Sequence, residues 1–170
     1  MVRVARFEKV SLRRFVTDWV ATFPQQTVEQ AVAAYERIRL PERATSGSAG
    51  YDLFAPVGFE LGAGEGIKIP TGLRVLIEEG WVLTIYPRSG LGFKYRFQLD
   101  NSVGVIDNSY CGTNDEWKLP VYATRDTEGK TLIVPSGTAF AQGIFLPFGI
   151  TVDDHAQGVR NGGLGSTTGH

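Results

Sequence analysis

At 170 residues, with 42% hydrophobic and 21% charged residues, the chain has the size and composition of one globular domain. Its formal net charge of -1 provides no overall field that would attract nucleic acid or an anionic membrane. One cysteine excludes an intrachain disulfide, and with two histidines it makes no plausible zinc site. No segment resembles a signal peptide or reaches the roughly 20 apolar residues of a membrane helix, so we expect a cytoplasmic protein.

Residues 11–39 show the periodicity of two helices. From Ser11 the apolar residues recur at helical spacing as far as the next proline, and the Ser11 side chain is suited to cap the first helix. Thr27 and Gln30 form a capping-box pattern at the start of a second helix, which we expect to end at Pro41. We interpret the pair as a helical hairpin whose apolar face packs on the main body. A groove that binds a partner is the alternative.

From residue 43 onward the pattern is that of strands. Short apolar runs recur between glycine and proline signals, which is typical of an antiparallel barrel or jelly roll. We expect one mainly β domain over residues 1–170, with a mobile segment at 158–170. The expected strands are a weak one at residues 2–7 and then Ile67–Ile69, Leu73–Ile77, Trp81–Tyr86, Lys118–Ala123, Thr131–Val134 and Ala139–Phe145.

Three neighbouring segments carry groups suited to chemistry or binding. In PRSGLGFK, Arg88, Ser89 and backbone N–H groups are suited to hold a phosphate, with a plain turn as the alternative. Residues 93–97 alternate aromatic and basic, which favours an amphipathic strand with its rings inward over a strand that stacks on nucleic acid. In GVIDNSYCG, Asp107 follows an apolar run, either as a polar turn or as a carboxylate that performs chemistry.

The C-terminal region offers two further candidates. The glycines and hydroxyls of residues 162–167, next to Arg160, are suited to a lid that folds over phosphates, with a disordered tail as the alternative. Gln142 lies in an apolar run, where its amide must find hydrogen-bond partners if it is buried.

Five segments in order resemble the motifs of the trimeric dUTP diphosphatases (dUTPases): AGYDL, PRSGLG, NSVGVIDNSYCG, GTAFAQGIF and RNGGLGSTTG. They span about residues 40 to 170, and five ordered motifs are far more specific than any one of them. The resemblance implies a distorted β jelly roll with an N-terminal helical hairpin insert. It also implies a homotrimer in which each active site combines motifs from all three subunits.

The resemblance implies that Asp107 is the general base of a hydrolase. It would activate a water that attacks the α-phosphorus of dUTP, which releases pyrophosphate and leaves dUMP. Such an enzyme removes dUTP from the nucleotide pool and supplies dUMP for thymidylate synthesis. Mg²⁺ is implied as the cofactor, held by substrate phosphates and waters rather than by protein ligands.

The same resemblance assigns the substrate contacts. Tyr110 would lie against the deoxyribose and exclude the 2′-hydroxyl of UTP. Asn101, with backbone groups of Val105 and Ile106, would bind uracil, and Asp52 would support the site. The phosphate contacts are Arg88, Ser89, Gly90 and Gln142, and the closing lid contributes Arg160, Leu164, Gly165, Ser166 and Thr167.

Several positions depart from the family's pattern. Leu164 stands where the family commonly has a phenylalanine over the uracil ring, and Arg160 is one residue closer to the paired glycines than usual. Cys111 replaces the usual arginine or glutamine, and residues 113–115 look inserted, so Lys118 has no assigned role. For the helical insert, packing at the edge of a trimer is the default.

Two alternatives remain open from the sequence. A dCTP deaminase shares the fold, but it needs a glutamate that activates water at the pyrimidine and does not need a glycine-serine-threonine lid. A non-catalytic trimer would instead capture a regulatory protein, with the helical hairpin as the recognition surface.

Overall fold

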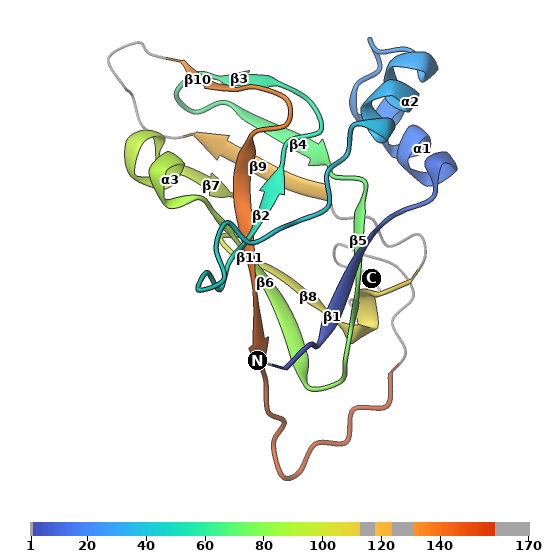
Figure 1. Cartoon of the computed structure of the whole chain (residues 1–170), viewed down its shortest axis with the longest axis vertical. Helices are drawn as coiled ribbons and strands as arrows, with labels where there is room; N and C mark the ends of the chain where they lie inside the picture. The colour runs from blue at the N-terminus through green and yellow to red at the C-terminus, as the bar shows by residue number, and fades with distance from the viewer. Residues whose placement is uncertain (1, 113–117, 124–130, 159–170) are drawn as a thin grey trace.

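The computed structural model describes residues 2–112, 118–123 and 131–158, the middle segment by its backbone. Strands dominate the described chain, and two of its helices lie together beside the sheets (Figure 1). The elements are β1 (Ala5–Lys9), α1 (Leu12–Thr22), α2 (Val28–Glu36), β2 (Tyr51–Phe54), β3 (Phe59–Leu61), β4 (Gly66–Pro70), β5 (Leu73–Ile77), β6 (Trp81–Pro87), α3 (Ser89–Tyr95), β7 (Phe97–Leu99), β8 (Gly104–Asp107), the 3₁₀ turn η1 (Asn108–Tyr110), β9 (Lys118–Ala123), β10 (Leu132–Val134) and β11 (Ala139–Pro147).

The described strands pair antiparallel throughout, in sheets of two to four strands. The largest sheet has the order β2-β11-β6-β8, and a second sheet has the order β4-β9-β7. β1 pairs with β5, and β3 pairs with β10. The expectation of a mainly β fold with an N-terminal helical hairpin is confirmed.

The core lies between these sheets and follows from the alternation of side chains along each strand. β5 shows this most regularly, because Leu73, Val75 and Ile77 are buried while the residues between them are half-buried. Leu83 and Ile85 of β6 and residues of β2, β7 and β11 complete the same cluster. The large sheet is therefore anchored on one face by apolar packing, which fixes its register and the polar groups at its ends.

The helical hairpin forms as its caps predict. Ser11 accepts a hydrogen bond from the Arg14 backbone N–H at 3.2 Å, and Thr27 and Gln30 form a complete capping box. The second helix ends at Glu36 rather than near Pro41, because the Ile38 backbone N–H donates to the Tyr35 carbonyl at 3.2 Å and closes a 3₁₀-like turn there. Figure 1 shows the two helices packed side by side at the upper end of β5.

The hairpin packs on the body through aromatic side chains. Phe15 and Trp19 of α1 are fully buried, with ring centroids 5.1 Å apart, and Phe15 also contacts Tyr35 of α2. The Tyr35 hydroxyl donates to the Val10 carbonyl at 2.7 Å, which ties α2 to the end of β1. The interpretation that the apolar face packs on the main body is confirmed.

The segment at residues 93–97 is not the amphipathic strand that its alternating composition favoured. It begins in helix α3, and Phe93 is 78% exposed rather than turned inward. Leu91 and Tyr95, four residues apart, pack on the core from one face of this helix. Arg96 then adopts a left-handed backbone with φ of 52° and ends the helix.

The other expected strands lie close to their predicted bounds, but the weak first strand begins and ends later than residues 2–7, at Ala5–Lys9. β2, β3, β7 and β8 had no separate prediction, because runs of three or four residues give too little alternation to recognise. None of the described helices is long and apolar enough to cross a membrane. Apart from residue 158, the segment expected to be a mobile lid lies outside the described residues.

Candidate active site

Asp107 is the last residue of β8, at the edge of the large sheet. It lies opposite Val82 of β6, and β6 is the partner of β8 among the described strands. Its Oδ1 accepts hydrogen bonds from the backbone N–H and the hydroxyl of Ser109, at 3.0 and 2.6 Å. Both contacts fall on one carboxylate oxygen, so they fix the rotation of the carboxyl group.

The 3₁₀ turn η1 follows Asp107 directly and carries Tyr110. The Asn108 amide donates to the Ile77 carbonyl of β5 at 2.6 Å, and the Cys111 thiol donates to the Asp107 carbonyl at 3.2 Å. Tyr110 is partly buried and packs against the core. The carboxylate and the tyrosine are therefore presented by one short turn held against β5.

A second cluster joins Asp52, Arg88 and Gln142 from three separate parts of the chain. Gln142 of β11 lies opposite Asp52 of β2 on one side and Tyr86 of β6 on the other. The Gln142 amide donates to the Pro87 carbonyl at 3.3 Å. Arg88 Nε lies 3.5 Å from Asp52 Oδ1, which is within ion-pair distance.

The surroundings of this cluster leave little room for change. A Cβ atom at Gly50 would lie 2.8 Å from Gln142 Oε1, so only glycine fits there without moving the amide. The Arg88 backbone N–H donates to the Phe140 carbonyl at 3.2 Å, which fixes the start of α3. Ser89 and Gly90 form the exposed first turn of that helix, next to Arg88.

The two clusters lie at different points along β6. Asp107 is opposite Val82 and Gln142 is opposite Tyr86, four positions further along. At ~3.3 Å per residue this is roughly 13 Å along the strand. One chain thus brings Asp107 and Tyr110 together, and brings Asp52, Arg88 and Gln142 together, but keeps the two groups apart.

The expected uracil contacts lie on β8 and in the turn before it, at the end of the strand away from Asp107 in the case of Asn101. Asn101 is exposed in the turn between β7 and β8, where its backbone carbonyl accepts a hydrogen bond from the Val103 backbone N–H at 2.7 Å. Val105 is 61% exposed and Ile106 is buried, as alternation along an edge strand requires. The expected lid residues Arg160, Leu164, Gly165, Ser166 and Thr167 lie outside the described residues.

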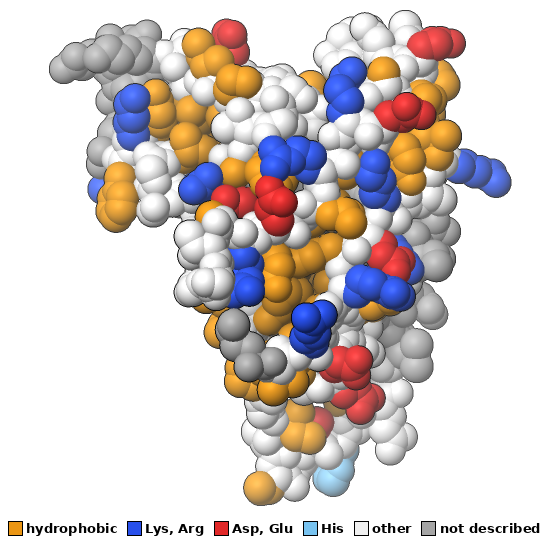
Figure 2. Space-filling view, viewed as in Figure 1, with side chains coloured by type: hydrophobic (Ala, Val, Ile, Leu, Met, Phe, Trp, Pro, Cys, Tyr) orange, Lys and Arg blue, Asp and Glu red, His pale blue; other side chains and the backbone are white. Residues whose placement is uncertain are grey.

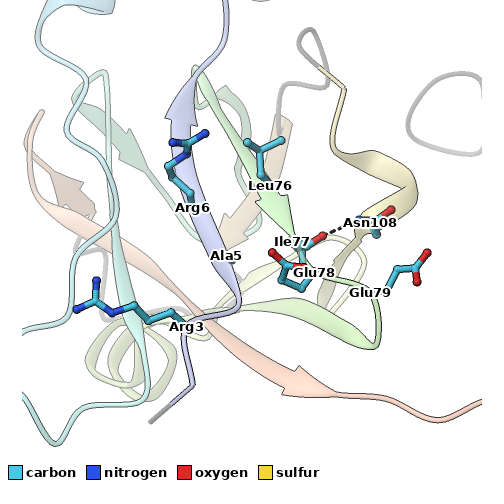
Figure 3. A pocket seen from close by; sticks show the side chains of 8 residues that line it. All are labelled: Arg3, Ala5, Arg6, Leu76, Ile77, Glu78, Glu79 and Asn108. Carbon is cyan, nitrogen blue, oxygen red and sulfur yellow. Dashed lines mark hydrogen bonds between the residues drawn. The ribbon is translucent and has the colours of Figure 1, made fainter.

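A pocket of about 600 Å³ lies beside Asn108, the first residue of the turn that follows Asp107. Figure 3 shows it between the ends of β1 and β5, with Asn108 at one wall and its hydrogen bond to Ile77 drawn. Arg3, Arg6, Glu78 and Glu79 give its rim both signs of charge. No motif in the sequence predicted this pocket, because its walls come from three segments that are distant along the chain.

Basic, acidic and hydrophobic side chains share the face shown in Figure 2, with hydrophobic ones gathered near its middle. An aromatic cluster of Phe7, Tyr51 and Phe145 has ring centroids 5.2 to 5.7 Å apart.

Across the described residues, no group of three or more His, Cys, Asp or Glu side chains is placed to hold a metal ion.

Comparison with known proteins places this arrangement in a family. The family model described as dUTPase matches residues 36–168. The chain belongs to the dUTPase family. Since the match begins at residue 36, α1 and most of α2 lie outside it, as expected for a helical insert.

Sequence relatives agree with this assignment. The chain is 37% identical over 132 residues to a deoxyuridine 5′-triphosphate nucleotidohydrolase from Lactococcus lactis, covering 76% of this chain and 88% of the relative. It is 40% identical over 139 residues to the protein of the same name from Tolumonas auensis, covering 77% and 88%.

Solved structures agree in fold. The dUTPase from Streptococcus mutans has a TM-score of 0.60 and 28% identity, and the match covers 87% of this chain and 98% of that one. A mutant dUTPase from phage phi11 of S. aureus has a TM-score of 0.62 at 20% identity, covering 92% and 98%, and its structure shows a coordinated structural Mg(II) ion. The expected dUTPase-like β fold is confirmed.

Proposed function

We propose that this protein hydrolyses dUTP to dUMP and pyrophosphate. The observation that carries the proposal is the turn after β8, where Asp107 and Tyr110 are presented together at a sheet edge in a chain of the dUTPase family. The hydrogen bonds from Ser109 hold Oδ1 of Asp107, so Oδ2 is the oxygen that we assign to the attacking water.

In this proposal Asp107 acts as the general base. It takes a proton from the water as the water oxygen bonds to the α-phosphorus of dUTP. The bond between the α-phosphorus and the oxygen that bridges to the β-phosphate breaks, and its electron pair leaves with pyrophosphate. The remaining product is dUMP, which makes the reaction both a removal of dUTP and a supply of dUMP for thymidylate synthesis.

Selectivity for deoxyuridine rests on residues of the same edge. Tyr110 packs against the deoxyribose and leaves no room for a 2′-hydroxyl. The Asn101 side chain and the backbone of Val105 and Ile106 bind uracil. β8 suits this task because it is an edge strand among the described strands of the large sheet, and an edge strand presents backbone N–H and C=O groups on one side. Cytosine reverses the donor and acceptor pattern, so each mismatched buried group costs about 1–3 kcal/mol.

The triphosphate is held by the second cluster. The Arg88 guanidinium, the Ser89 hydroxyl and the Gly90 backbone lie at the start of α3, and the Gln142 amide lies next to them on β11. Asp52 orients Arg88 from 3.5 Å and does not itself perform chemistry. Arg160, Leu164, Gly165, Ser166 and Thr167 form the lid that closes over the bound nucleotide.

The separation of the two clusters supports a homotrimer with shared active sites. With roughly 13 Å of β6 between them, Asp107 and Gln142 of one chain are poorly placed for the same α-phosphate. A neighbouring subunit can instead bring its Arg88 and Gln142 to the Asp107 of the first. Each site then takes its base, its phosphate contacts and its lid from different chains.

Mg²⁺ is the cofactor in this proposal. We expect the ion to be held by phosphate oxygens of the substrate and by waters rather than by protein ligands. When bound, the ion neutralises charge on the triphosphate.

We place the enzyme in the cytoplasm, without nucleic-acid or membrane partners. A regulatory protein that binds the 11–39 hairpin remains a prediction.

Pyrophosphate release from dUTP, dCTP, dTTP and UTP, measured with Mg²⁺ and the purified full-length protein, tests the proposal. Release from dUTP alone is the expected result. Ammonia release from dCTP would instead support a deaminase. A folded trimer that releases nothing from any of them would support the non-catalytic binding protein.

A further inference from the structure

Arg74 joins β1 and β5 to the turn that follows Asp107, although no motif of the sequence includes it. It lies on β5, and its side chain is only 11% exposed. Its Nε and Nη2 atoms donate to Glu8 Oε2 of β1 at 3.2 and 2.6 Å. Its Nη1 atom donates to the Cys111 carbonyl, directly after η1, at 3.2 Å.

The geometry of the guanidinium explains how one side chain serves both elements. Its donors lie in a rigid planar fork, so the two bonds to Glu8 fix the direction in which Nη1 points. Glu8 and Arg74 are opposite each other in the β1–β5 ladder, which sets their separation. The Arg74 hydrogen bond is also the main reason that the pKa of Glu8 lies below its ordinary value.

A second hydrogen bond ties the same turn to the same strand. The Asn108 amide donates to the Ile77 carbonyl, three positions after Arg74 on β5. The turn is therefore held at its first residue, Asn108, by the Ile77 carbonyl. Just past its last residue, at Cys111, it is held by Arg74. The pocket opens beside Asn108, so side-chain packing does not fully surround the turn at that end (Figure 3).

We propose that Arg74 is a positioning residue that holds Tyr110 and Asp107 in their working geometry. The inference rests on the proposed function, because those two residues select the sugar and activate the water there. Arg74 does not touch the substrate. It holds the turn through its hydrogen bond to the Cys111 carbonyl. Glu8 in turn fixes the orientation of the Arg74 guanidinium and balances its positive charge.

The test compares Arg74→Met with the wild-type protein and with Arg6→Ala. Methionine keeps an unbranched apolar stem of similar course and removes every donor. Arg6 is a matched control, because its Nε also binds Glu8, at 3.0 Å, but its side chain is 73% exposed and it has no bond to the turn among the described contacts. Steady-state kcat/KM is measured for dUTP and for UTP.

In Arg74→Met we expect kcat/KM for dUTP to fall roughly 10- to 100-fold, the scale for a small misplacement of reacting groups. The ratio of dUTP to UTP kcat/KM should also fall, by about tenfold, because Tyr110 is no longer held against the sugar. Arg6→Ala should keep both values. A mere loss of folded protein lowers both rates together and leaves the ratio unchanged, so an unchanged ratio overturns the inference.

Amide hydrogen exchange of the nucleotide-free proteins provides a second measurement that does not depend on activity. Exchange at residues 108–111 should be faster in Arg74→Met, while β4 and β10 keep wild-type exchange. Equal exchange at residues 108–111 in the two proteins overturns the inference that Arg74 holds the turn, even if activity falls. A wild-type protein that does not hydrolyse dUTP overturns the proposed function instead, and the exchange result still decides whether Arg74 holds the turn.

Discussion

The Ser109 hydroxyl donates a 2.6 Å hydrogen bond to Oδ1 of Asp107, and the Ser109 backbone N–H donates to the same oxygen. A residue two positions away thus orients the carboxylate that we propose as the base. Such local contacts cost little chain entropy, because the turn itself brings the groups together.

Asp107→Asn should retain dUTP binding and lose turnover. The amide is nearly isosteric and can still accept from Ser109, but it cannot take a proton from water. We expect kcat to fall by at least roughly a hundredfold, the usual scale for a positioned general base. Single-turnover kinetics and calorimetric binding of dUTP separate the two effects, and near-normal turnover would refute the assignment.

Ser109→Ala should show a smaller effect of the same kind. The variant removes one of two hydrogen bonds to Oδ1 and keeps the one from the backbone. A single net hydrogen bond predicts a decrease in kcat of roughly three- to tenfold with KM nearly unchanged. Ser136→Ala is a suitable control, because that hydroxyl donates to the Pro56 carbonyl far along the chain from this turn. An equal decrease in both variants would contradict a specific role for Ser109.

Sharing of sites between subunits should appear as complementation. Asp107→Asn and Arg88→Ala chains are each expected to be nearly inactive alone. Random 1:1 trimers that take each residue from a different chain would have both residues intact in about a quarter of their sites. Activity after the two are unfolded and refolded together measures this.

The control for complementation is the double variant Asp107→Asn, Arg88→Ala, refolded with itself. It has no intact pair in any arrangement and should stay inactive. If a single chain supplied both residues to one site, mixing the single variants would restore nothing. That outcome would remove the argument based on the separation along β6.

The sequence predicts the regular parts of this fold well, and the reason is visible in particular residues. Leu73, Val75 and Ile77 alternate with half-buried residues, so the strand Leu73–Ile77 matches its prediction to the residue. Helix α3 escaped prediction because Gly90 and Gly92 disfavour helix, whereas packing of neighbouring side chains on the core stabilises it.

The candidate site divides in the same way. Asp107 could be named as a candidate from its place after an apolar run, and the ordered motifs then implied its role, since both are read from local order along the chain. The contact between Arg74 and the Cys111 carbonyl joins positions 37 apart, and the contact between Arg74 and Glu8 joins positions 66 apart. No local pattern encodes such contacts, because they depend on the register of β1 on β5 and on the course of the turn.

The pH dependence of stability should reveal the Glu8–Arg74 pair. The Arg74 hydrogen bond lowers the pKa of Glu8 from its ordinary value of 4.5. A group with a depressed folded pKa stabilises the protein above its unfolded pKa, and this contribution is lost as the pH falls through the folded value. Glu8→Gln should therefore lower Tm at neutral pH, and the difference from wild type should shrink below about pH 4.5.

Thermal unfolding followed by circular dichroism across this pH range measures that difference. Glu60→Gln is the matched control, because Glu60 is exposed on β3, away from Arg74. A difference in Tm between Glu8→Gln and wild type that stays constant as the pH falls would show that the lower Tm comes from packing rather than from the charge of Glu8.

Docking of the helical hairpin can be tested at Gly72. Its φ of 67° disfavours any side chain, and a Cβ atom there would overlap Ile38 Cδ1 and lie 3.0 Å from Phe15 Cδ2. Gly80 has a similar φ of 79° but nothing within 4 Å of the same Cβ position. Gly80→Ala therefore measures the backbone strain alone, which is about 1–2 kcal/mol.

Gly72→Ala should cost more than Gly80→Ala, by about 1–3 kcal/mol, because the hairpin must shift to relieve the overlap. Denaturant unfolding gives both free energies, and faster amide exchange in α1 and α2 should accompany the larger loss. Equal losses in the two variants would show that Ile38 and Phe15 adapt without cost. The hairpin would then rest on β4 and β5 less tightly than the buried Phe15 and Trp19 indicate.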